Sequence, residues 1–237
     1  MKILAFDTSA DIATCALCED DRLIAETSLR TKTHSSVILP CAEALMRSSG
    51  LGFRDIEMYA ASVGPGSFTG IRIGVATAKG LAFPESTPCV GVSSLEAMAW
   101  NLACIPCIAV PVIDARRGMV YTALFRNDGE GRVMRLCDDT QVPVAELGAM
   151  LSAYEGETVL FTGDAYDAVR KELGNEYGAQ TPPRLRWQSA YGVARAAYEK
   201  WNKTSDRSVF TDVSLNPVYL KKSQAERERE ERLNSEK

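Results

Sequence analysis

Apolar and polar residues alternate along the first part of the chain in short blocks that have the lengths of strands. Three apolar runs, KILAFDT, ATCALCE and RLIAETSL, are separated by polar turns at residues 9–11 and 20–21. Because these connections are short, we expect the three strands to form an antiparallel meander. A helical pattern follows over residues 33–49, with Thr33 as its N-cap and a kink or a restart expected at Pro40.

Strands and helices are expected to alternate after this helix. The run MYAASVG is a predicted strand, residues 69–83 a predicted helix and PCVGV a short strand. Ser93 and Glu96 stand three residues apart before LEAMAWNLA, as in a capping box that starts another helix. The first half is therefore predicted to have the order βββαβαβα.

The second half repeats this order. CIAVPVID, MVYTALFR and GRVMRLCD are predicted strands, followed by a helix over residues 144–154, a strand TVLFTG, a helix over 165–173, a short strand RLRWQ and a helix over 190–201. Two consecutive βββαβαβα units predict a duplicated α/β architecture, with one lobe at residues 1–105, another at 106–216 and a charged tail at 217–237. Asp7 and Asp114 then end the first strand of each lobe and become equivalent positions.

Composition and charge restrict the classes of function. The 237 residues are 46% apolar and 24% charged, with a net charge of -4, so no global electrostatic footprint for nucleic acid exists. A local patch of Arg72, Lys79, Arg116 and Arg117 keeps a tRNA-binding module open as an alternative. No apolar run has the length of a signal peptide core or a membrane span, and we expect a cytoplasmic protein.

Seven cysteines fit that compartment, since most lie in apolar runs where a free thiol behaves as a small hydrophobe. The pairs Cys15/Cys18 and Cys104/Cys107 have metal-ligand spacing. In a strand, however, residues three apart point to opposite faces, so the first pair favours packing over a metal.

The stretch GPGSFTGIRIG, residues 64–74, looks like a phosphate-binding loop but matches none of the common motifs. It lacks the Lys of a P-loop, the glycine spacing of a dinucleotide fingerprint and the flanking glycines of a nucleophile elbow. Its glycines still permit close backbone approach, and the helix after them offers free N–H groups to an anion. A structural turn and a ligand-binding loop both stay open.

Titratable side chains add few catalytic candidates. His34 is the single histidine, which excludes a multi-histidine metal site and favours a capping or interface role. Asp7, in FDTS, and Asp114, in IDARRG, end strands where an acidic group can face a cleft. Asp7 can order a metal-bound nucleotide, or it can cap the turn at Thr8 and Ser9.

These segments resemble the TsaB (YeaZ) family. The motifs that carry the resemblance are ILAFDTS, HSSVILP, VGPGSFTGIRIGVATAKGLA, GVSSLEAMA, VIDARRGMVYTALF, LFTGDA and NPVYLKK, in family order over nearly the whole chain. The resemblance implies the duplicated actin-like ATPase (ASKHA) and RNase H-like fold. It also implies a non-catalytic subunit that binds and activates TsaD for threonylcarbamoyl transfer to the adenosine adjacent to the anticodon in tRNA.

The resemblance also implies that no catalytic or metal-binding residues remain. Ser94 and Met98 stand where TsaD has a pair of metal-binding histidines, and Arg116 and Arg117 stand where it has a glycine-rich phosphate loop. The alternative is an enzyme in its own right, either a nucleotide-dependent phosphotransferase or a glycoprotease-like enzyme of the same fold.

By the same resemblance, the helices at residues 33–49 and 69–83 carry the partner interface, to TsaD in the complex and to a second copy when the chain is alone. The expected interface residues are His34, Val37, Ile38, Cys41, Leu45, Phe68, Thr69, Ile71, Arg72, Val75 and Lys79. ADP or ATP is expected only at the seam with TsaD, beside Asp7, Ser9, Gly66 and Ser67, and the isolated chain is expected to bind no cofactor. A TsaE-type ATPase is a further expected partner, with tRNA reached only through the complex and no contact with a membrane.

Overall fold

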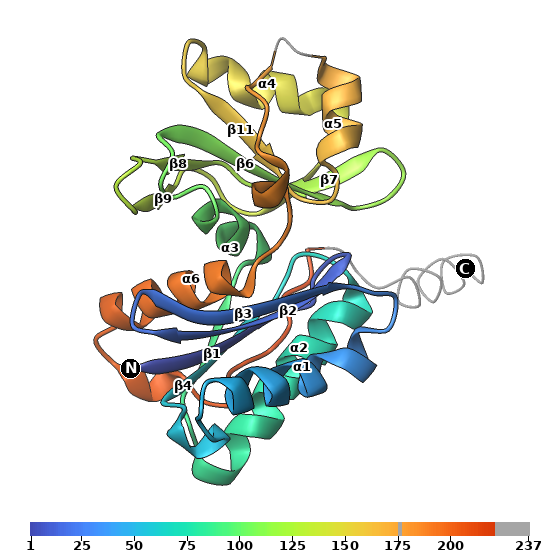
Figure 1. Cartoon of the computed structure of the whole chain (residues 1–237). Coiled ribbons are helices and arrows are strands. Elements are labelled where there is room, and N and C mark those ends of the chain that lie inside the picture. The colour runs from blue at the N-terminus through green and yellow to red at the C-terminus, as the bar shows by residue number, and fades with distance from the viewer. Residues whose placement is uncertain (175–176, 221–237) are drawn as a thin grey trace, which may run out of the picture.

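The computed structural model describes residues 1–174 and 177–220, which form two lobes, each built on a β-sheet (Figure 1). The elements of the first half are β1 (Lys2–Asp7), β2 (Ile12–Glu19), β3 (Arg22–Arg30), α1 (His34–Ser48), β4 (Met58–Ser62), α2 (Phe68–Ala82), β5 (Cys89–Val92) and α3 (Ser94–Trp100). Those of the second half are β6 (Cys107–Asp114), β7 (Met119–Thr122), β8 (Phe125–Asn127), β9 (Val133–Arg135), β10 (Thr140–Pro143), α4 (Leu147–Leu151), β11 (Val159–Thr162), α5 (Tyr166–Leu173) and α6 (Ala190–Lys203).

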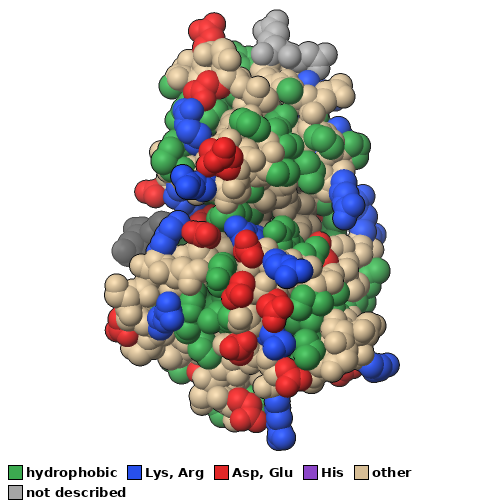
Figure 2. All heavy atoms as spheres, turned by 60° about the vertical axis from the view of Figure 1, so that its left-hand side comes forward, with side chains coloured by type: hydrophobic (Ala, Val, Ile, Leu, Met, Phe, Trp, Pro, Cys, Tyr) green, Lys and Arg blue, Asp and Glu red, His purple; other side chains and the backbone are tan. Residues whose placement is uncertain are grey.

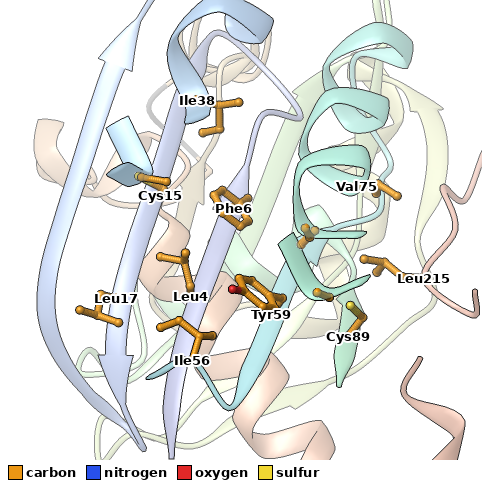
Figure 3. Close-up of a cluster of buried hydrophobic side chains, with 14 of the residues drawn as sticks. Leu4, Phe6, Cys15, Leu17, Ile38, Ile56, Tyr59, Val75, Cys89 and Leu215 are labelled. Carbon is orange, nitrogen blue, oxygen red and sulfur yellow. The ribbon is translucent and has the colours of Figure 1, made fainter. Parts of the chain in front are cut away.

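The first sheet has the order β3-β2-β1-β4-β5. As predicted, β1, β2 and β3 form an antiparallel meander, while β4 and β5 add in parallel beside β1. On one face, side chains from the sheet such as Phe6 and Tyr59 pack beneath Ile38 of α1 and Val75 of α2 (Figure 3). Cys15 packs on this face and Cys18 on the other, which confirms that the two thiols point apart.

The second sheet repeats this plan incompletely. Its central strand β6 pairs with β11 in parallel and with β7 and β8 in antiparallel fashion. The predicted strand MVYTALFR is divided into β7 and β8, and the sequence did not indicate β10, which pairs with β7. The prediction of a strand at RLRWQ is wrong, because Pro183–Arg186 is a 3₁₀-helix. Next to β11, where a further strand would extend the sheet, the described residues form only an isolated bridge between Leu160 and Ala179.

Helix α6 corrects the predicted division of the chain. Residues 190–201 were expected in the second lobe, but Val193 and Ala197 pack on the first sheet with Ile3 and Met58 (Figure 1). The neighbouring helix α3 has only seven residues and cannot cover that face alone. Gly192 permits the two helices to approach closely, because a Cβ there would come under 3.0 Å from the carbonyl oxygen of Ala97.

Two further expectations concern α1 and the tail. Helix α1 continues through Pro40, so the predicted restart does not occur. Of the charged tail predicted over residues 217–237, positions 221–237 lie outside the described residues. The preceding segment runs along the first lobe, where the Val218 N–H donates to the carbonyl oxygen of Val63 at 2.7 Å. Among the residues with described positions, no helix combines the length and the apolar character needed to span a membrane.

Candidate functional site

A cleft of about 820 Å³ lies between the two lobes. Its walls come from the turn after β1, the loop before α2, the β6–β7 turn and the C-terminal segment. The residues that line it include Ser9, Asp11, Lys32, His34, Gly66, Ser67, Phe68, Asp114, Arg116, Arg117, Asp164 and Tyr219. Predicted site residues from both halves of the chain therefore meet at one opening.

Asp7 lies behind the cleft wall and is completely buried. Its Oδ1 accepts hydrogen bonds from the N–H and the hydroxyl of Ser9, at 2.8 and 2.6 Å, and from the hydroxyl of Ser62 at 2.9 Å. Burial raises the pKa of the carboxyl despite these bonds. Asp7 therefore caps its turn through Oδ1, while its Oδ2 is buried without a hydrogen-bond partner among the described residues. The predicted nucleotide contact of Asp7 stays a prediction.

The glycines of the stretch at residues 64–74 pack against the protein itself. A Cβ at Gly66 would come under 3.0 Å from the carbonyl oxygen of Ser9, and one at Gly70 would come equally close to that of Thr8. Gly66 also has a φ of +152°, which side chains with a Cβ rarely adopt. Ser67 caps α2 by accepting a hydrogen bond from the Gly70 N–H at 3.2 Å. Close packing of the loop on the β1–β2 turn accounts for these glycines.

Acidic side chains occupy part of the cleft wall. Asp164, which the sequence analysis missed, follows β11, and its Oδ1 accepts a hydrogen bond from the Asp114 N–H at 2.9 Å. Burial above all, together with the nearby charges of Asp11 and Asp114, raises the pKa of this carboxyl to about 6, although the hydrogen bond from the Asp114 N–H lowers it. Asp114 in turn accepts hydrogen bonds from the backbone and the side chain of Arg116. The motif FTGDA ends a strand as FDTS does, which is the signal that identifies Asp164.

The lining of the cleft is mixed in charge. Carboxylates of Asp11, Asp114 and Asp164 face the same space as the cations of Lys32, Arg116 and Arg117. The β6–β7 turn carries Arg116 and Arg117 at φ +67° and +57°. Their side chains stand where a phosphate loop would use glycine to bring backbone N–H groups close. The turn therefore lacks the glycine backbone of a phosphate loop, and whether the isolated chain binds a nucleotide stays a prediction.

The histidine positions of the related TsaD motif also lack suitable groups. Ser94 and Met98 are both buried within α3, where Met98 packs with Leu95 and Leu102. A thioether and a single hydroxyl in such surroundings make a poor ligand set for a metal that prefers imidazole.

The predicted interface residues divide into two sets. Ile38, Leu45, Ile71 and Val75 are buried in the core of the first lobe, so we withdraw them from the interface. The predicted residues that remain accessible are His34, Val37, Cys41, Phe68, Thr69, Arg72 and Lys79. The apolar periodicity predicted a broad apolar face on each of the two helices, but it did not show which residues of that face the sheet buries.

The outer side of α1 and α2 exposes further residues that the sequence analysis did not select. Leu39 is 40% exposed, and Pro40, Ala44, Ala76 and Gly80 are also exposed. The two helices lie side by side on the first lobe, facing away from its sheet (Figure 1). We name this surface, made of Leu39, Pro40, Ala44, Ala76 and Gly80, the helix-pair face.

A stack of three side chains closes one edge of the cleft next to this face. The rings of Phe68 and Tyr219 lie 4.9 Å apart, and the guanidinium of Arg72 lies 3.8 Å from the Phe68 ring centroid. The Arg72 Nε–H donates to the Tyr219 hydroxyl at 2.7 Å. Tyr219 thus ties the C-terminal segment to the start of α2, a contact between residues 147 positions apart.

We expect Asp164 to make stability depend on pH. Its pKa is about 6 in the folded protein and 3.8 as an ordinary carboxyl, so the folded state holds the proton more tightly. The free energy of unfolding should therefore fall as pH rises from about 4 to about 6 and stay level above that range. Asp164→Asn keeps an oxygen to accept the Asp114 N–H and removes this slope. Urea unfolding of both proteins across this range measures it, and a difference between them that is independent of pH would contradict the assignment.

Known proteins resemble both the sequence and the fold. Residues 27–148 match the family described as TsaD: tRNA N6-adenosine threonylcarbamoyltransferase. The chain is 38% identical over 165 residues to the tRNA threonylcarbamoyladenosine biosynthesis protein TsaB of Bacillus subtilis, covering 69% of this chain and 71% of that protein. It is 39% identical over 134 residues to TsaB of Escherichia coli, covering 55% of this chain and 58% of that protein.

The fold is similar to that of YeaZ from Pseudomonas aeruginosa, with a TM-score of 0.79 and 22% sequence identity. This match covers 92% of the chain and 99% of that structure. The structural match therefore includes both lobes, while the alignment to the E. coli relative spans little more than half of each chain.

Proposed function

Because the chain belongs to the TsaB (YeaZ) family, we propose that it is the non-catalytic subunit that binds and activates a TsaD-type threonylcarbamoyltransferase. The transferase would attach the threonylcarbamoyl group to the adenosine adjacent to the anticodon in tRNA. We propose the cytoplasm as the compartment in which the chain acts. The observation that carries this proposal is the helix-pair face.

The helix-pair face has the chemistry of a surface that packs against another pair of helices. Its residues are small or apolar, as in the interiors of stable interfaces, and the exposed Glu43 and Arg47 of α1 lie among them as charged groups that a partner would have to match. Gly80 has open space where a Cβ would stand, so a partner backbone can approach α2 closely at this point. Exposed Leu39 supplies a larger apolar side chain on α1. An isolated lobe gains nothing from displaying these groups to water.

The cleft supports the non-catalytic half of the proposal. The β6–β7 turn carries Arg116 and Arg117 in place of the glycines of a phosphate loop, and Oδ1 of Asp7 is engaged with Ser9 and Ser62. The competing reading, a phosphotransferase of the same fold, requires magnesium and nucleotide in that space. A glycoprotease requires a metal site or a nucleophile with a base, and the single histidine lies at the start of α1 without a nucleophile assigned to it.

We also propose a second copy of the chain, a nucleotide and an ATPase as partners. Alone, the chain would pair with a second copy through α1 and α2, and the TsaD-type subunit would compete for that surface. We keep ADP or ATP as a ligand of the seam, where Gly66 and Ser67 are accessible beside α2, and a TsaE-type ATPase as the partner that acts there. The isolated chain is not proposed to bind either nucleotide.

Reconstitution tests the proposal directly. The purified chain is mixed with a TsaD-type subunit, and size exclusion should show a heterodimer in place of the separate species. Transfer to tRNA should then require the chain. Activity in its absence should be lower by at least about tenfold, which corresponds to about 1.4 kcal/mol of activation free energy. Undiminished modification of tRNA in the absence of the chain would contradict the proposal. Calorimetry with magnesium and ATP distinguishes the phosphotransferase, because tight binding by the isolated chain would favour it.

A further inference from the structure

We propose that basic residues around the opening of the cleft bind the phosphate backbone of RNA. We name this set, Arg30, Lys32, Arg116, Arg117 and Arg184, the basic rim. The inference rests on the proposed function only in its choice of tRNA as the RNA. It differs from that function because it gives this chain a nucleic-acid contact of its own.

The rim draws residues from both lobes to one opening. Lys32 from the first lobe and Arg117 from the second line the same cleft. Arg30 ends β3 two residues before Lys32, and its guanidinium lies 4.2 Å from the centroid of the Trp187 ring. Arg184 lies on the 3₁₀-helix that precedes Trp187, and this helix is held at the end of β11 because the Thr162 hydroxyl donates to the Leu185 carbonyl oxygen at 2.7 Å.

Most of these cations are available for a ligand. Within the described parts of the chain, no carboxylate lies within 4.0 Å of the charged groups of Arg30, Lys32, Arg117 or Arg184. Other arginines are neutralised, as Arg126 is by Glu157 at 2.6 Å. On the face drawn in Figure 2, acidic and basic side chains lie close to one another in the same way. The rim is thus a local excess of positive charge on an acidic protein.

Two of the rim residues, in the β6–β7 turn, have strained backbone conformations. Arg116 and Arg117 both adopt left-handed φ angles, followed by Gly118 at +74°. Residues other than glycine pay about 1 kcal/mol or more in that region, and asparagine or glycine would relieve the strain. The turn nevertheless holds two arginines, both exposed, at the edge of the cleft.

The arrangement of charge selects an extended polyanion over a small phosphate ligand. A phosphate that entered the cleft would meet Asp114 and Asp164, whose charges oppose it. A nucleic-acid backbone that lies across the opening can place successive phosphates at rim residues of both lobes and avoid those carboxylates. The Arg30 guanidinium lies over the ring of the partly exposed Trp187, which holds this cation in place at the rim.

Charge reversal in the heterodimer tests the rim. The double variant Lys32→Glu/Arg117→Glu, bound to a TsaD-type subunit, should bind tRNA at least tenfold more weakly at about 0.1 M salt than the unmodified complex. Loss of about two phosphate contacts should also lower the slope of log affinity against log salt by about 1.5. Filter binding over a salt series measures both quantities.

Strand β3 offers a matched control. Arg22 begins this strand and Arg30 ends it, so the two arginines lie about 26 Å apart at about 3.3 Å per residue. Arg30→Glu should weaken tRNA binding, whereas Arg22→Glu should leave it within about twofold, although both make the same change of net charge. Circular dichroism confirms that each variant is folded.

The possible outcomes separate the two proposals. If the heterodimer forms and the double variant binds tRNA as Arg22→Glu does, the rim is refuted while the proposed function stands. If no heterodimer forms, the proposed function fails, and the same tRNA titration on the isolated chain decides the rim. If the double variant loses affinity for an acidic peptide such as polyglutamate but not for tRNA, the rim is a protein-binding surface and the RNA proposal is overturned.

Discussion

Replacing Gly70 by Ala should destabilise the protein by about 3 kcal/mol, although alanine is the better helix former. Gly70 lies in the first turn of α2, where a Cβ would come under 3.0 Å from the Thr8 carbonyl oxygen. That oxygen belongs to the backbone and cannot rotate away as the end of a side chain can. The Thr8 hydroxyl also donates to the Gly70 carbonyl oxygen at 2.7 Å, so moving the helix outward strains a buried hydrogen bond.

The same helix contains the control for this prediction. Gly80 lies near the end of α2, and nothing lies within 4 Å of where its Cβ would stand. At a protein concentration low enough to keep the chain monomeric, Gly80→Ala should therefore stabilise the fold by about 0.5 to 1 kcal/mol through helix propensity, because the helix-pair face is then exposed to water. Urea unfolding of the isolated chain at one protein concentration compares the two. Effects of the same sign would show that the β1–β2 turn does not confine the glycine-rich loop.

Replacing Ala76 by Glu should weaken pairing with the TsaD-type subunit by at least about 100-fold, or nearly 3 kcal/mol. Ala76 is exposed on α2 within the helix-pair face. In the free chain its substitution leaves a carboxylate in water, which costs little. In the heterodimer that carboxylate would lose its water between packed helices. The cation four residues away, Arg72, is engaged with Tyr219 and Phe68, so burial of the new charge is strongly unfavourable.

The second lobe provides a matched substitution for this test. Ala153 is also exposed, and it lies on the 3₁₀-helix Ser152–Tyr154. Ala153→Glu adds the same side chain and the same charge, and pairing should be unchanged. Analytical size exclusion and calorimetry with the TsaD-type subunit measure both variants, and the unfolding midpoint of each free chain confirms that the fold is intact. Equal binding by the two variants would show that the partner does not cover the helix-pair face.

Local patterns in the sequence were sufficient to predict most of the first lobe. The apolar runs KILAFDT and ATCALCE correspond to β1 and β2, and the short polar turn between them imposes the antiparallel pairing. Ser93 caps α3 as predicted, accepting from the N–H groups of Leu95 and Glu96. Each of these features depends on residues a few positions apart, and short-range hydrogen bonding and side-chain periodicity therefore encode them.

Contacts between distant residues account for most of what was missed. Asp164 reaches the cleft only because β11 pairs with β6, which aligns the ends of two strands separated by some fifty residues of chain. Tyr219 meets Phe68 and Arg72 because the C-terminal segment returns to the first lobe. No periodicity near either residue indicates such a neighbour.

The two levels of information divide clearly at the glycine-rich stretch. By itself the sequence determined that GPGSFTGIRIG is a turn leading into a helix, that the lobes are duplicated, and that the TsaB family is the relevant one. Only the tertiary structure decided that these glycines pack against Thr8 and Ser9, and that Ile38 and Val75 belong to the core while Ala76 faces outward. The physical reason is that the type of a residue limits which contacts it can make. Whether that residue is buried, and which backbone comes close to it, depends on the distant segments that pack against it in the folded chain.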